Sequence, residues 1–192
     1  MPADPMARIW TTYKTRILSE QRFNKYAVAS HLALTWYAFL SIVFSIYQGD
    51  IAKTLGEPGA SQASLVMAVM TFGLSLVIYG FKFEDSARTH RDCYLKMQSI
   101  FQSTEPDQSK LHEYRKLLEH FPNHATRDYR QLLFNGWRAG ALVTDTQGNA
   151  VPFDGKDAAL VYARYILNIV AIIIIFLVPL ALITYWLVAP KW

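Results

Sequence analysis

Residues 165–190 read YILNIVAIIIIFLVPLALITYWLVAP, 26 consecutive residues without Asp, Glu, Lys or Arg. A hydrocarbon core of about 30 Å is crossed by roughly 20 apolar residues in a helix that rises about 1.5 Å per residue. A helix on a soluble domain would carry charges on its wet face. This stretch is therefore expected to cross a bilayer, and the fold must be built around it.

Two further stretches of this kind lie upstream, at residues 27–47 and 62–81, with 21 and 20 residues respectively. The first is too long for the apolar core of a cleaved signal peptide, which has about 7–15 residues, so we expect a retained helix. The sequence predicts an all-α integral membrane protein. Its expected parts are an N-terminal cytosolic amphipathic helix at 1–26, a transmembrane hairpin at 27–81, a cytosolic helical segment at 82–160 and a third transmembrane helix at 161–192.

The distribution of Lys and Arg predicts the orientation of the spans. The arm before residue 27 carries five of these residues, the segment at 82–164 carries twelve, and the loop at 48–61 and the tail carry one each. Basic residues accumulate on the cytoplasmic side of a membrane. The N-terminus and the long segment are therefore expected in the cytoplasm, and the C-terminus outside.

Several helix boundaries can be predicted from caps and breakers. Gly56 indicates a turn between the first two spans, and the second span is expected to continue past the membrane as one helix because no Gly or Pro interrupts residues 81–105. A helix capped by Asp107 or Ser109 should reach Glu119 or His120, Asn123 should cap the next one, and Gly140 should end it. Residues 141–145 and 150–153 predict a hairpin. The arm is expected on the inner membrane face or against the cytosolic segment, through a stripe of Met6, Ile9, Trp10, Tyr13 and Ile17.

Composition argues against several classes of function. The net charge of +4 gives little reason to expect nucleic-acid binding, and the single Cys93, expected to be a small buried residue, cannot form an intrachain disulfide. A Gly-rich phosphate loop and the His-Glu-x-x-His pattern are missing from the sequence. His120, His124 and Asp128 have helical ligand spacing, but Pro122 should break that helix. We expect neither enzymatic activity, nor a cofactor, nor a metal.

Polar and small side chains follow one face of each of the first two spans. Asn24 and Gln48 extend the first row at its two ends, Asn168 in the third span is placed to bond a neighbouring helix, and Pro179 should kink that span. Such rows either let helices pack closely or line a water path in an oligomer. The rows comprise His31, Thr35, Ala38, Ser41 and Ser45 in the first span and Ser64, Ala68, Thr71 and Ser75 in the second.

A polar corner is expected where two cytosolic helices meet. It comprises Tyr114, Asn123, His124, Arg127 and Asp128. In a structural interpretation Asn123 caps a helix and Asp128 pairs with an arginine. In a functional interpretation the corner is a contact surface for a signal or a partner protein.

The order of these parts resembles the SLATT family, the SMODS and SLOG-associating two-transmembrane effector domains. The likeness rests on the arm Tyr13-Lys-Thr-Arg16, the second span Ser75-Leu-Val-Ile-Tyr79 that continues towards the cytosol, and the element Tyr114-x-x-Leu-Leu, Asn123-His124 and Asp128-Tyr129. It covers roughly residues 8–190. The third span departs from a two-helix pattern and is typical of longer subfamilies with an added C-terminal helix.

The resemblance implies a bacterial antiphage effector in the inner membrane. Such a protein oligomerises on a signal, forms a pore or disrupts the bilayer, and arrests growth or kills the cell. The implied partners are the lipid bilayer, further copies of the chain, and a cyclic oligonucleotide signal or its synthase, or a reverse transcriptase. The residues alone leave two other functions open: a non-conducting anchor or scaffold for a cytosolic partner, and a small transporter or channel.

Overall fold

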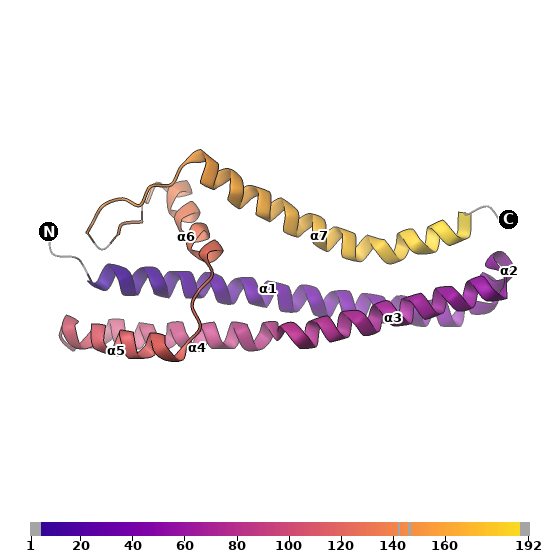
Figure 1. Ribbon diagram of the computed structural model, residues 1–192, viewed down its shortest axis with the longest axis horizontal. Coiled ribbons are helices and arrows are strands. Elements are labelled where there is room, and N and C mark those ends of the chain that lie inside the picture. The colour runs from indigo at the N-terminus through magenta and orange to yellow at the C-terminus, as the bar shows by residue number, and fades with distance from the viewer. Residues whose placement is uncertain (1–4, 142, 146, 189–192) are drawn as a thin grey trace. The chain divides into compact units, whose positions relative to one another are not determined.

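A computed structural model describes residues 5–141, 143–145 and 147–188 of the chain (Figure 1). Within that part, residues 144 and 150 form an isolated antiparallel bridge and the regular structure is otherwise helical. Three helices are long and apolar enough to cross a membrane. The all-α membrane fold is therefore confirmed. The helices are α1 (Pro5–Ile46), α2 (Gln48–Leu55), α3 (Glu57–Phe81), α4 (Phe83–Gln102), α5 (Asp107–His120), α6 (Thr126–Arg138) and α7 (Gly155–Val188).

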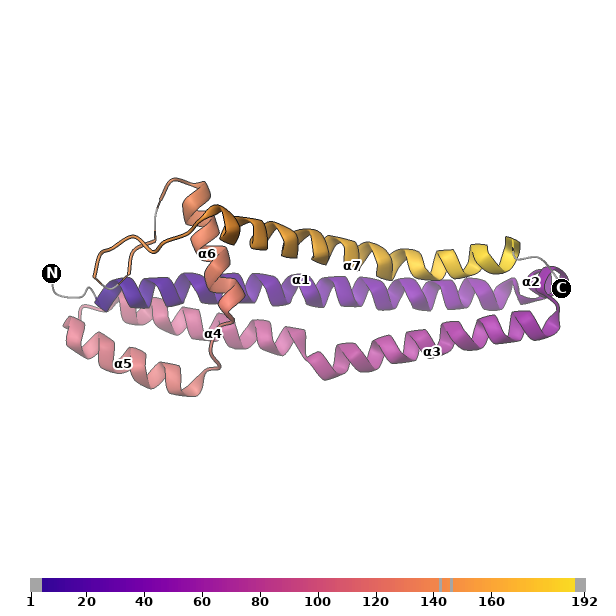
Figure 2. The same ribbon diagram turned by 45° about the horizontal axis from the view of Figure 1, so that its top comes forward.

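The chain divides into two compact units. One, which we call the head unit, consists of Met1–Lys25 and Phe83–Tyr165, and the other, the span unit, consists of Tyr26–Lys82 and Ile166–Trp192. In the head unit α5 doubles back beside α4, and in the span unit α3 returns beside α1 after the short α2 (Figures 1 and 2). Helices α1 and α7 each contribute residues to both units.

The predicted continuation of the second span as one helix is wrong at a single residue. Lys82 separates α3 from α4 and adopts the left-handed conformation, with φ +45°. This conformation costs an L-residue roughly 1–2 kcal/mol. A lysine at this position therefore does not predict a break in the helix. The predicted turn between the first two spans is present at Gly56, where φ is +77°, but residues that precede it form the helix α2.

The boundaries of the head unit follow most of the expected signals. Helix α5 begins at Asp107 and ends at His120, and Gly140, with φ +67°, follows α6. The predicted cap by Asn123 is wrong, because the chain stays extended as far as Ala125, which precedes α6. The hairpin is present: the amide of Val151 donates to the carbonyl of Val143 at 2.9 Å.

Three apolar clusters stabilise the two units, and each cluster lies within a single unit. In the head unit, Ile9 of the arm packs with Cys93, Met97 and Tyr114 of α4 and α5. The arm therefore lies against α4 and α5, in the segment expected to be cytosolic, which is one of its two expected positions. A second head cluster joins α6 to the hairpin. It comprises Leu132, Leu133 and Val143. In the span unit, Tyr37, Leu40 and Met67 join α1 to α3.

Candidate functional site

The arm of α1 buries a polar face in the head unit. Next to Ile9, the side chains of Thr12, Thr15, Arg16 and Ser19 are also buried. The hydroxyls of Thr12 and Thr15 donate to carbonyls of the preceding helical turn at 3.0 and 2.8 Å, and the hydroxyl of Ser19 has two acceptors within reach, the carbonyl of Thr15 at 3.1 Å and a carboxylate oxygen of Asp128 at 2.7 Å. Their burial therefore leaves no hydroxyl unsatisfied, which is the general condition for placing polar groups in a core. Arg16 is the exception on this face.

Arg16 lies at the centre of a buried polar cluster and has no exposed surface. Its Nη1 donates to Nδ1 of His90 at 3.1 Å and to the backbone carbonyl of Pro122. Burial lowers the pKa of the Arg16 guanidinium, but from a value so high that the group remains charged at any physiological pH. Two neutral acceptors thus hold a full positive charge inside the head unit.

A second arginine of the arm pairs with Asp128. Arg22 donates through Nε and Nη2 to the two carboxylate oxygens at 2.7 and 2.8 Å, and Ser19 adds a third bond at 2.7 Å. Burial alone would raise the pKa of Asp128, but these hydrogen bonds and the charge of Arg22 outweigh it, and the pKa is lowered. The predicted pairing of Asp128 with an arginine is confirmed, and it ties α6 to α1.

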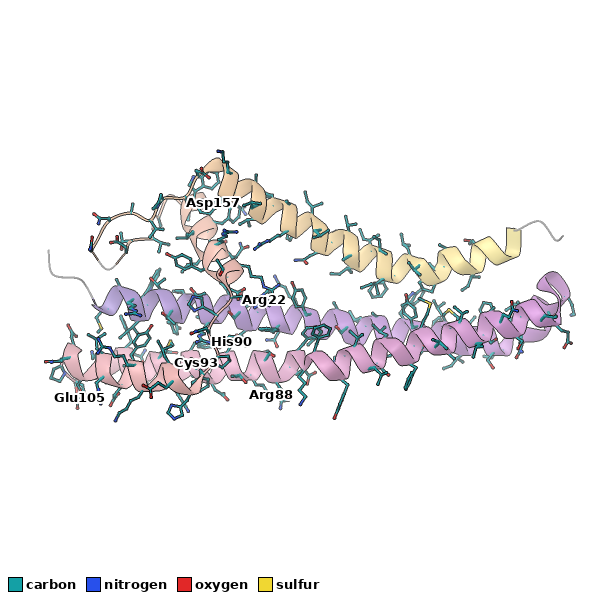
Figure 3. The ribbon with its side chains drawn as sticks, in the orientation of Figure 1. Arg22, Arg88, His90, Cys93, Glu105 and Asp157 are labelled. Atoms are coloured by element: carbon teal, nitrogen blue, oxygen red, sulfur yellow. The ribbon has the colours of Figure 1, made fainter. Side chains whose placement is uncertain are left out.

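His90 of α4 completes the cluster (Figure 3). Burial, reinforced by the charge of Arg16, lowers the pKa of this imidazole to about 4, so it is neutral at pH 7. Because a guanidinium only donates, Nδ1 of His90 must accept and the proton must reside on Nε2. Phe23 stacks on the imidazole, with ring centroids 5.5 Å apart. Cys93, one turn further along α4, has no exposed surface, which confirms its expected burial.

The predicted signal-contact residues separate into two groups. Tyr114 and Asp128 are buried, and the hydroxyl of Tyr114 bonds that of Thr12 at 2.9 Å. Asn123 and Arg127 are exposed, and His124 is half-buried. Burial and the charge of Arg16 lower the pKa of His124, so it borders the same cluster. Part of the corner is thus buried and hydrogen-bonded, and part of it is exposed. Its role in contacting a signal stays a prediction.

In the span unit, two side chains of α1 bond the backbone of α7 next to a proline. Pro179 is fully buried within α7 and has no N–H to donate to the carbonyl of Ile175, one helical turn earlier. The hydroxyl of Tyr37 donates to that carbonyl at 2.9 Å. The indole of Trp36 donates to the carbonyl of Phe176 at 3.2 Å. α1 therefore supplies the hydrogen bond that the proline removes.

A double-mutant cycle tests this arrangement. Tyr37→Phe should lower the free energy of unfolding by about 1–2 kcal/mol, because it strands the carbonyl of Ile175 in an apolar medium. In a Pro179→Ala background the new amide can donate to the same carbonyl, so the same substitution should have almost no effect. Unfolding of the detergent-solubilised chain measures both values. Equal losses in the two backgrounds would show that the tyrosine stabilises the chain in some other way.

The polar rows of the spans are only partly in contact with each other. Ser41 and Thr71 meet, with their hydroxyl oxygens 3.3 Å apart, and each also donates to its own helix. Ala38, Ser64 and Ser75 are half-buried. The exposed members of the two rows are His31, Thr35, Ser45 and Ala68. Both packing and pore lining therefore remain predictions for these positions.

The sequence interpretation missed Arg16, Ser19, Arg22 and His90. The arm was assigned an apolar stripe that includes Trp10, which is 41% exposed. A usable signal lies in α4, where His90 falls in the helical row of buried apolar residues Ala87, Cys93, Met97 and Ile100. A histidine in such a row indicates a polar partner inside the core. The arginines give no comparable signal, because a buried and a solvated polar face look the same in sequence.

Comparison with known protein families gives a match over most of the chain. Residues 4–186 match a family model described as SMODS and SLOG-associating 2TM effector domain family 5, SLATT_5. No curated protein and no solved structure matches the chain. The matched range includes α7 almost to its end, so the third apolar helix falls within the family pattern.

Proposed function

The chain belongs to SMODS and SLOG-associating 2TM effector domain family 5, and from that premise we propose that it is a membrane effector that permeabilises the bilayer when a signal or partner acts on its head unit. It is a multi-pass membrane protein. The proposed site is the inner membrane of a bacterium, with the N-terminus in the cytoplasm and the C-terminus outside. The proposed consequence is growth arrest or death of a phage-infected cell.

The observation that carries this proposal is the exposed polar row of α1. His31, Thr35 and Ser45 lie on the outside of the span unit, at positions that a membrane protein usually fills with apolar residues. Polar side chains within a span usually face the interior of a bundle or a water-filled cavity. Further copies of the chain can supply such a cavity, because a single copy has too few spans to enclose one.

The spans also leave ample surface for assembly. Of the most apolar 18-residue windows, that of α7 has no residue buried within the chain, that of α3 has 6% and that of α1 has 28%. We propose homo-oligomers that form through these surfaces. Asn168 is exposed on α7, and a copy of the chain in the same membrane presents the same amide at the same depth.

The proposed trigger acts on the head unit, which is the part of the chain expected in the cytoplasm. A cyclic oligonucleotide, its synthase or a reverse transcriptase would be such a trigger if it bound an open arrangement better than the closed one. We propose no catalysis by the chain itself. Burial raises the pKa of the Cys93 thiol, so that this side chain is not a ready nucleophile.

Membrane potential in cells that express the chain with its trigger tests the proposal. Triggered wild-type protein should depolarise the membrane. A variant with Thr35→Val, Ser41→Ala and Ser45→Ala should insert equally well and lose most of that depolarisation, because the path would lose its hydroxyls. Phe39→Leu, at an exposed apolar position of the same span, is the matched control. If the triple variant keeps full activity, the row serves packing only; if the wild type never depolarises cells, the chain is an anchor or scaffold.

A further inference from the structure

We propose that Arg16 is the receptor for an oxyanion, a phosphate or a carboxylate, which binds the guanidinium edge formed by Nε and Nη2. The inference rests on the proposed function, because the anion would be the chemical group through which a signal acts on the head unit. It adds a ligand class and a receiving residue to that function.

The first argument is the balance of buried charge. Among the described residues, Asp128 is the one buried carboxylate, against the buried Arg16 and the nearly buried Arg22. Arg22 occupies both oxygens of Asp128. Arg16 has only His90, which is neutral at pH 7, and a backbone carbonyl. A buried charge without a counter-charge is costly, so the closed head unit carries a free-energy penalty that an anion would remove.

The second argument is the geometry of the unused donors. Nε and Nη2 of Arg16 are buried and make no hydrogen bond within the described part of the chain. These two nitrogens form the edge of a guanidinium that matches a carboxylate or phosphate with two parallel bonds. Arg22 uses the same edge to hold Asp128 at 2.7 and 2.8 Å. The chain thus contains one arginine edge that binds a carboxylate, on Arg22, and a second edge of the same kind, on Arg16.

The third argument concerns access. Both nitrogens lack exposed surface, so an anion reaches them only if the covering chain moves. Residues 121–125, which link α5 to α6 without regular structure, lie next to this guanidinium and place the carbonyl of Pro122 on its Nη1. Pro122 and Asn123 are exposed on the outer side of this segment. An anion that binds Nε and Nη2 would therefore have to displace neighbouring chain such as this segment, which couples binding to a change of state.

The test uses the full-length chain in nanodiscs of zwitterionic lipid. Thermal unfolding is followed with inorganic phosphate, adenosine monophosphate or succinate, each against chloride at the same ionic strength. Saturating oxyanion should raise Tm by about 2–4 °C, as expected for about 1 kcal/mol of linkage in a chain of this size. The order of the three ligands distinguishes phosphate, nucleotide and carboxylate sources. Hydrogen exchange at residues 121–125 should become faster when the ligand is bound.

Arg16→Lys keeps the charge but loses the two-pronged edge, and should reduce the Tm shift to the chloride level. Arg8→Lys, an exposed arginine of the same helix, should retain the full shift. The proposal is overturned if the wild type shows no shift with any of the oxyanions, or if Arg16→Lys keeps it. Should Arg16→Lys fail to fold, hydrogen exchange of the wild type decides: unchanged exchange at 121–125 with ligand rejects the site. None of these measurements depends on depolarisation, so the proposed function can fail separately.

Discussion

Asp128→Ala is expected to lower the free energy of unfolding of the head unit by about 3–5 kcal/mol, the range for breaking a buried ion pair from one side. The substitution leaves Arg22, which is only 14% exposed, without its carboxylate. It also removes the carboxylate that accepts from Ser19, which is the one buried negative charge among the described residues. The two donor nitrogens of Arg22 would then be stranded in a region that already holds an uncompensated cation, whereas Ser19 could still donate to the carbonyl of Thr15.

Thermal or denaturant unfolding of the purified chain measures this loss, and Asp92→Ala, at an exposed position of α4, is the matched control. Asp128→Asn should cost less, because an amide oxygen can still accept from one arginine nitrogen. The lowered pKa of Asp128 also determines the direction in which the stability of the head unit changes with pH. The pair's contribution is complete above the ordinary carboxyl pKa and is lost as pH falls through the folded-state value. Equal stability of the Asp128 and Asp92 variants would show that the pair contributes nothing.

The spans and their approximate ends were predictable because lipid imposes a simple rule on composition. Residues 165–190 and the two stretches upstream have no alternative to membrane burial. The break at Lys82 was not predictable, since the left-handed conformation is disfavoured for a lysine and no Gly, Pro or Asn marks the position. The absence of a cap at Asn123 was also not predictable. This residue type favours helix caps, but here it lies in the non-helical segment whose Pro122 carbonyl accepts from Arg16.

Only part of the candidate site was predictable from the sequence. Asp128 and His124 were recognised because they belong to a polar corner close in sequence, but their partner helix lies more than 100 residues away, as the Arg22–Asp128 bond shows. Polar residues of the arm carry no mark that distinguishes a buried face from a solvated one. Tyr37 lies within an apolar run, and its role depends on a proline in another span.

The pH dependence of stability provides the second large effect. The pKa of His90 is lowered from 6.5 to about 4 by burial, and next by the charge of Arg16. Between these values the unfolded chain binds a proton that the folded chain does not, so stability must fall as pH falls from 6.5 towards 4. The neighbouring His124 is shifted in the same direction by burial and by Arg16. We expect a loss of about 2–3 kcal/mol from His90 across this window.

His90→Gln should remove most of that slope, because Gln does not titrate and its amide oxygen can still accept from Arg16. His112→Gln, at an exposed position of α5, should leave the slope unchanged. Unfolding curves at pH 7, 5.5 and 4.5 for the three proteins measure the difference. In the folded chain the carboxyl group of Asp128 stays ionised through this window because its pKa is lowered, so it adds slope only at the acid end, where the unfolded carboxyl begins to take up a proton. A wild type equally stable at pH 7 and 4.5 would mean that His90 takes up its proton in place, and that the cluster around Arg16 is open to water.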